Sequence, residues 1–166
     1  MKKLCLVMAF VVCSFWVVGG AFAASDTGDL TVNAAVSARA KLTLDPTTIN
    51  FPDSDPDTVP SISATENPVD VTAKVRTGAA SNATLTCLAG GDLVSGGDTI
   101  AISTVTWTVT GAGFVAGTMS RLAAQSAGSW TGSGNYSGTF SYALANSWDY
   151  EIGNYTATVT YTLTAP

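Results

Sequence analysis

Apolar and polar residues alternate through most of the chain after residue 24. The clearest run covers residues 155–164, in which apolar side chains alternate with five threonines. A period of two is typical of a strand that buries one face and exposes the other. The same alternation predicts strands at 30–36, 69–76, 83–88, 104–110 and 136–144, and an interrupted strand from Leu42 to Phe51.

Residues that favour turns separate these runs. Glycine-rich stretches fall at 90–92, 95–98, 111–113, 132–135 and 153–154, where turns require positive φ. Residues 51–68 hold four prolines and are predicted to be a loop that crosses between two sheets. The Ala-rich stretch 120–127 is predicted to form at most a short helical turn. We therefore predict an all-β fold, an antiparallel Ig-like sandwich of about seven to nine strands, and a single sheet closed on itself is the alternative.

The first 23 residues have the pattern of a secretory signal. Lys2 and Lys3 precede an apolar run of about fifteen residues, which is shorter than the ~20 that span a bilayer. Ala21 and Ala23 follow at the spacing of a cleavage site. We predict that residues 1–23 are a signal peptide. Residues 24–166 would then form a single domain without a transmembrane segment, in the periplasm, at the cell surface or outside the cell. An uncleaved anchor and a lipoprotein are the alternatives.

Composition excludes several classes of function. The formal net charge is −5. Without Lys2 and Lys3 the chain has five basic and twelve acidic residues, and its net charge is −7. Such a chain is unsuited to nucleic acid, because binding phosphates requires clustered lysine and arginine. The sequence has no histidine, the commonest general base and metal ligand. Since it also lacks the common nucleophile and phosphate-loop motifs, we predict a non-enzymatic protein without a cofactor.

Two acidic stretches are candidate sites. Residues 53–57 alternate carboxylates as the start of a calcium loop does, but Thr58 and Ala64 stand where that loop needs glycine and an acidic residue. We interpret the stretch as a solvated loop. Asp149 and Glu151 are too close in sequence to face each other across a glycosidic bond.

Aromatic residues and the one cysteine after residue 23 leave alternatives open. Aromatic side chains could stack on a saccharide or pack in the core: Trp107, Trp130, Tyr136, Trp148 and Tyr150. A monomeric binding module for carbohydrate or calcium is therefore the alternative function. Cys87 lies in a strand-like setting and is predicted to be a small buried hydrophobic residue rather than a reactive thiol.

Three segments resemble a known group of bacterial proteins. Leu30–Val36, Thr47–Phe51 and Gly153–Tyr161 are similar to the opening strand, the following phenylalanine-bearing segment and the final Gly-x-Tyr strand of spore coat protein U and fimbrial pilin-like domains. Those families usually join their early strands by a disulfide, whereas Arg39 or Ala40 stands here at the first cysteine position.

The resemblance implies a structural or adhesion-type protein, such as a fimbrial or coat-like subunit. Its partners would be other copies or other surface subunits, joined when a strand of one fills a groove in the next. The donor face would consist of Leu30, Val32, Ala34 and Val36. Alternatively, this segment pairs within its own domain.

Basic residues alternate on the outer faces of two predicted strands, where they would discourage edge pairing: Arg39, Lys41, Lys74 and Arg76.

Overall fold

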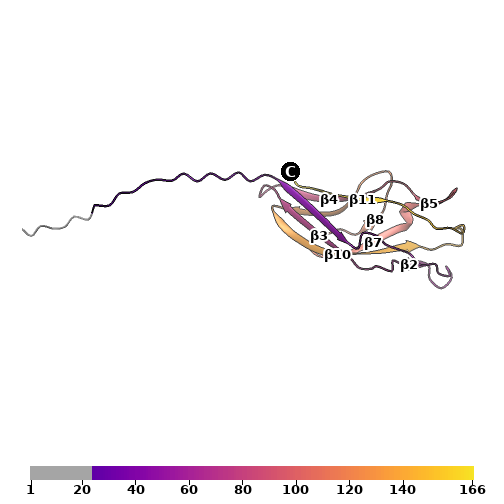
Figure 1. Ribbon diagram of the computed structural model, residues 1–166. Coiled ribbons are helices and arrows are strands. Elements are labelled where there is room, and N and C mark those ends of the chain that lie inside the picture. Colours follow the sequence, from indigo (N-terminus) through magenta and orange to yellow (C-terminus); the bar gives the residue numbers. More distant parts are fainter. Residues whose placement is uncertain (1–23) are drawn as a thin grey trace, which may run out of the picture. The chain divides into compact units, whose positions relative to one another are not determined.

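The computed structural model describes residues 24–166 (Figure 1). The predicted signal peptide, residues 1–23, lies outside the described residues together with its predicted cleavage site at Ala21 and Ala23. The chain divides into two units, residues 1–34 and 35–166. All strands of the described part lie in the second unit. No helix within residues 24–166 is long and apolar enough to cross a membrane.

Two antiparallel sheets make up the fold. The larger follows the order β1 (Arg39–Asp45), β3 (Val69–Arg76), β10 (Gly134–Ala145), β7 (Val105–Thr110) and β8 (Gly117–Thr118), while β2 (Ser61–Ser63) pairs with the end of β10. The smaller follows the order β11 (Val159–Thr164), β4 (Asn82–Ala89) and β9 (Gln125–Thr131). A separate hairpin of β5 (Leu93–Ser95) and β6 (Asp98–Ile100) precedes a single 3-10 turn, Ile102–Thr104.

The core lies between the two sheets, where their apolar faces meet. Alternate residues of β3 and of β4 are buried, and both strands lie inside their sheets. Trp107 and Phe140 from the larger sheet and Leu85 from the smaller sheet are among the largest fully buried side chains. The alternation seen in the sequence therefore marks two layers that bury one face each.

The all-β sandwich prediction is confirmed. Within residues 24–166, seven strands have six or more residues and the other four have two or three. The strand predicted at 69–76 has the same bounds in the structure, and those predicted at 83–88, 104–110 and 136–144 correspond to β4, β7 and β10. The strand predicted over 155–164 begins only at Val159.

Four details of the prediction were wrong. Residues 30–36 belong to no strand, and the interrupted strand ends at Asp45, before Pro46. The 46–68 connection joins two strands of the same sheet, so it does not cross between sheets. Residues 125–131 form β9, where a helical turn was expected up to residue 127. Small residues hid β9, because Ala127 and Gly128 supply no bulky apolar alternation.

Candidate functional site

One lateral side of the sandwich is closed by the chain itself. The segment 111–118, which leads from β7 into β8, runs along β9 of the opposite sheet. The Val115 amide donates to the Ala127 carbonyl at 3.0 Å, and the Ser129 amide donates to the Gly113 carbonyl at 2.9 Å. Backbone hydrogen bonds therefore link the two sheets here, and we call this the closed side.

Tryptophan side chains fill the closed side. Trp107 Nε1 donates to the Val115 carbonyl at 2.8 Å, and Trp130 Nε1 donates to the Ala112 carbonyl at 2.9 Å. Gly113 has φ of +82°, and a Cβ there would lie 2.3 Å from Trp130 Nε1. Gly128 lies under the same ring, with its ideal Cβ position 2.6 Å from the indole. The close approach of backbone to indole thus requires glycine at both positions.

The opposite side, between β1 and β11, is open. These strands are the last members of their sheets on this side, and within residues 24–166 no backbone hydrogen bond joins them. Their inward side chains are only half-buried, although they pack against the core: Leu42, Leu44, Val159, Tyr161 and Leu163. We call this the open side.

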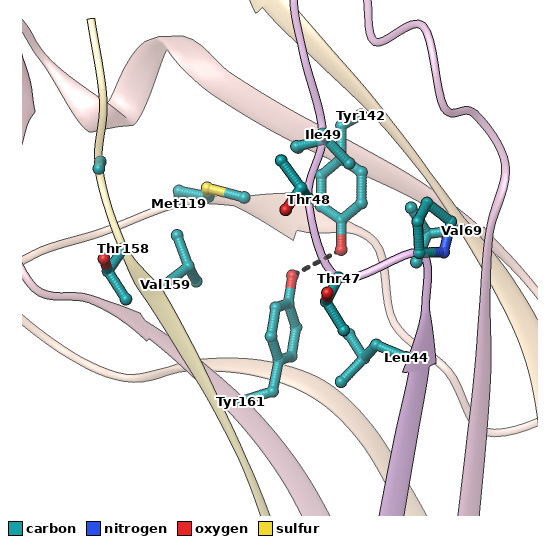
Figure 2. Close-up of a pocket in the computed structure, with 12 residues that line it drawn as sticks. Leu44, Thr47, Thr48, Ile49, Val69, Met119, Tyr142, Thr158, Val159 and Tyr161 are labelled. Carbon is teal, nitrogen blue, oxygen red and sulfur yellow. Dashed lines mark hydrogen bonds between the residues drawn. The ribbon is translucent and has the colours of Figure 1, made fainter.

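A cavity of about 510 Å³ lies in the open side. Figure 2 shows Leu44 and the loop of Thr47, Thr48 and Ile49 across the cavity from Val159. Most of the lining is apolar: Leu44, Pro46, Ile49, Val69, Met119, Ala157 and Val159. The cavity is therefore a place where an apolar side chain would lose contact with water and fill unoccupied space.

Two tyrosines from opposite sheets meet in this cavity. The hydroxyls of Tyr142 and Tyr161 lie 2.8 Å apart and are hydrogen-bonded (Figure 2). Burial raises the pKa of Tyr142 to about 12, and burial also raises that of Tyr161. Cys87, opposite Tyr161 on β4, is buried as predicted, and burial raises its pKa to about 11. At neutral pH all three groups are protonated, so the cavity presents no charge from them.

A short polar clasp holds the loop that lines the cavity. The backbone amide and the Nδ2 amide of Asn50 each donate to the Glu66 carboxylate at 2.6 Å. The amide of Thr65 donates to the Asn50 carbonyl at 2.9 Å. The two bonds from Asn50 lower the pKa of Glu66, since they favour its charged form. The loop 46–50 is thereby fixed beside the cavity.

β11 has one free edge. Among the residues that the structure describes it pairs only with β4, so the backbone groups that alternate toward the other side lack a strand partner there. Its outward side chains are the exposed Thr160, Thr162 and Thr164. A free edge beside an apolar cavity is the combination that an added strand uses, with main-chain hydrogen bonds along the edge and side chains in the pocket.

The predicted donor residues are exposed. The exposed fraction is 86% for Leu30, 81% for Val32 and 70% for Val36, and Ala34 is exposed as well. The alternative, that this segment pairs within its own domain, stays a prediction. The alternating apolar side chains of 30–36 are left without a strand partner in the described part of the chain.

The acidic loop bonds to the protein itself. Asp55 Oδ1 accepts from the Asp57 amide at 2.9 Å, and Asp57 Oδ1 accepts from Trp148 Nε1 at 3.1 Å. Asp149 accepts from the Ser147 hydroxyl at 3.0 Å, while the Glu151 side chain is exposed. Among the residues the structure describes, no three His, Cys, Asp or Glu side chains form a group that could hold a metal ion.

The five aromatic residues considered for a saccharide do not form one surface. Trp107 and Trp130 are buried, and Tyr136 stacks on Trp130 with ring centres 4.9 Å apart. Tyr150 is half-buried and donates to the Ala145 carbonyl. Trp148 alone among the five is largely exposed, at 70%. Most of these rings therefore pack within the sandwich.

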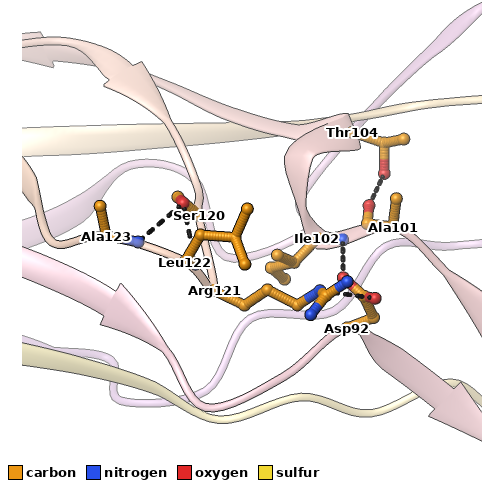
Figure 3. A network of polar contacts seen from close by, with 8 residues as sticks. All are labelled: Asp92, Ala101, Ile102, Thr104, Ser120, Arg121, Leu122 and Ala123. Carbon is orange, nitrogen blue, oxygen red and sulfur yellow. Dashed lines mark hydrogen bonds and ion pairs between the residues drawn. The ribbon is translucent and has the colours of Figure 1, made fainter.

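A polar network fixes the segment before β9. Arg121 Nε lies 2.9 Å from Asp92 Oδ2, and Asp92 Oδ1 accepts from the Ile102 amide at 3.0 Å (Figure 3). The Ser120 hydroxyl accepts from the amides of Leu122 and Ala123. These bonds join three segments, around Asp92, Ile102 and Arg121, that together span about 30 positions of the chain. Sequence reasoning did not single out this network.

The cavity residues were also missed from the sequence. Alternation identified the apolar face of each strand, but the strand that ends a sheet has the same pattern as one inside it. The useful signal was the end of β1 at Pro46, since proline interrupts pairing. The sequence matches no protein-family model, and it has no significant match among curated proteins.

Proposed function

We propose that the chain is an exported, non-enzymatic structural subunit that assembles by strand donation. In each contact, segment 30–36 of one copy fills the open side of the next copy. The single observation that carries the proposal is the coexistence of an apolar cavity beside a free strand edge with an exposed, alternating segment of the same chain.

The length of segment 30–36 matches the length of the free edge of β11. A seven-residue extended segment spans roughly 20 Å at about 3.3 Å per residue. β11 has six residues, so its free edge is nearly as long as the donor. The even-numbered residues of the segment are apolar and most of the odd-numbered ones are polar, so one face can enter the sandwich while the other meets water.

Donation between copies is favoured over a tight hairpin within one copy. A two-residue turn at Ser37–Ala38 would place Val36 opposite Arg39. Residues opposite each other share a face, and Arg39 lies on the exposed face of β1. The apolar donor side chains would then point outward. Ser37 and Ala38 also lack the glycine, asparagine or aspartate that such turns favour.

The test is assembly of the purified, exported protein. Size-exclusion chromatography with light scattering, before and after unfolding and refolding, should show polymers. The variant L30D/V32D should remain monomeric, because it places two charges among the apolar side chains of the open side. The control T31D/N33D adds two charges to the opposite face of the same segment and should still assemble.

A monomer that stays monomeric after refolding would overturn the proposal. Equal loss of assembly in both variants would also count against it, because strand donation requires the two faces to differ. Circular dichroism of each variant checks that the sandwich itself is folded.

A further inference from the structure

Charge is segregated along the outer face of β1 and β3. The register pairs Arg39 with Arg76 and Lys41 with Lys74, then Thr43 with Thr72, and finally Asp45 with Asp70. Cations therefore face cations at one end of the ladder, and carboxylates face carboxylates at the other. Like charges directly opposite on a sheet repel, so this arrangement weakens the ladder.

The cationic pairs mark one end of the sandwich. Ser37, just before β1, accepts from Arg76 Nε at 2.8 Å, so the donor segment leaves the domain here. The Thr77 hydroxyl donates to the Pro166 carbonyl, which places the end of β11 nearby. Figure 1 shows the C-terminus beside the start of β1. We call this the cationic end; its residues are Arg39, Lys41, Lys74 and Arg76.

The opposite end is acidic. β10 starts opposite Val75 near the cationic end and finishes at Ala145. Asn146, the next residue, donates to the carbonyls of Ser54 and Val59, which brings the 53–59 loop to this end. The residues 149–151 follow shortly after. We call this the acidic end; its carboxylates are Asp45, Asp53, Asp55, Asp57, Asp70, Asp149 and Glu151.

Within the described part of the chain, no salt bridge joins the cationic end to a carboxylate. Within residues 24–166, the ion pair that the structure contains joins Arg121 to Asp92, at another place in the fold. Four of the five basic residues after residue 23 thus gather, without a salt bridge, on a protein whose charge is otherwise negative. A second copy offers a complementary surface, because its acidic end has the opposite sign.

We propose that the cationic end of one copy docks against the acidic end of the next, and that this contact fixes the direction of the donated strand. The inference rests on the proposed function. With the donor domain at the acidic end of the acceptor, Val36 lies near Val159 and Leu30 near Thr164. The donated strand then runs antiparallel to β11 and parallel to β1.

The charges of the donor segment favour the same direction. Asp26 and Asp29 precede Leu30, and in this orientation they reach the cationic end of the acceptor. In the reverse orientation they would approach the acidic end, while the two cationic ends would meet. The contact is heterologous, since each copy uses different surfaces, and repetition gives an open filament.

A charge exchange tests the docking surfaces. The variant K41E/K74E cancels the net charge of the cationic end, and D53K/E151K removes most of the negative charge of the acidic end. Each alone should slow assembly about tenfold or more at low salt, and an equimolar mixture should regain most of the rate. Salt near 1 M should remove the differences, because the Debye length falls to about 3 Å. The control T84E/S129E places two opposed glutamates on the outer face of the other sheet and should assemble normally.

Disulfide trapping tests the direction. In a Cys87→Ala background, copies carrying D29C and copies carrying T164C are mixed and refolded under oxidising conditions. This pair should form mixed dimers on a non-reducing gel, whereas S37C with T164C should not. The reverse result would overturn the direction, and failure of the charge mixture to recover would overturn the docking surfaces. Both failures differ from loss of the proposed function, in which the unmodified protein forms no polymer.

Discussion

The two sides of the sandwich differ in how the edges of the two sheets are covered. On the closed side, residues 111–118 cross to β9, and the indoles of Trp107 and Trp130 are buried under glycines. On the open side, β1 and β11 approach without pairing, and Leu44, Val159 and Tyr161 remain half-buried. The comparison shows that a sandwich can be joined by backbone hydrogen bonds along one side and still keep a free strand edge and a cavity along the other.

The largest expected contrast is in the stability of the monomer. Trp130→Ala removes a buried indole from the closed side and should lower the free energy of unfolding by about 3–5 kcal/mol. Leu163→Ala on the open side should cost clearly less, roughly 1–2 kcal/mol, because its side chain is already half in water. Urea unfolding of the L30D/V32D monomer, in which donation is blocked, measures both.

Assembly should sharpen the same contrast. In polymers assembled as proposed, the donor segment would cover Leu163, so the free-energy cost of Leu163→Ala should rise, while that of Trp130→Ala should change little. If Leu163→Ala lowers the free energy of unfolding equally in monomer and polymer, the open side is not covered in the polymer. The difference between the two sides would then have no role in assembly.

The strands inside the sheets could be predicted from the sequence, but the two sides could not. Val69, Val71 and Val75 alternate with charged and polar residues, and this pattern correctly predicted where β3 begins and ends. β9 was missed because Ala127 and Gly128 give no bulky apolar alternation. Gly128 is small because the Trp130 ring and the Gly113 backbone approach it closely in the fold. Leu42 and Leu44 alternate as core residues do, and their partial exposure depends on what lies beside β1, which periodicity does not encode.

A smaller effect is expected at the tyrosine pair that connects the sheets beside the cavity. Tyr142→Phe or Tyr161→Phe removes one hydroxyl of a hydrogen bond of 2.8 Å, and each should cost about 0.5–1.5 kcal/mol. The double variant should cost less than the sum, because neither change then leaves an unpaired hydroxyl. A double-mutant cycle by urea unfolding gives the coupling. Strict additivity would show that the two hydroxyls do not stabilise each other.

The smallest expected effect is the pH dependence of the clasp between Asn50 and Glu66. Hydrogen bonds from Asn50 lower the pKa of Glu66 below its ordinary value of 4.5 in the folded protein. The clasp therefore stabilises the fold fully above that ordinary value, and the contribution is lost as the pH falls through the lower, folded pKa. Thermal unfolding of Glu66→Gln should differ from the unmodified protein at pH 7 and converge with it in acid. Asp53→Asn is the control, since it removes an exposed carboxylate outside the clasp. If the difference in thermal stability between Glu66→Gln and the unmodified protein stays the same in acid, the effect comes from packing and not from charge. Apolar contacts alone would then hold the loop 46–50 beside the cavity.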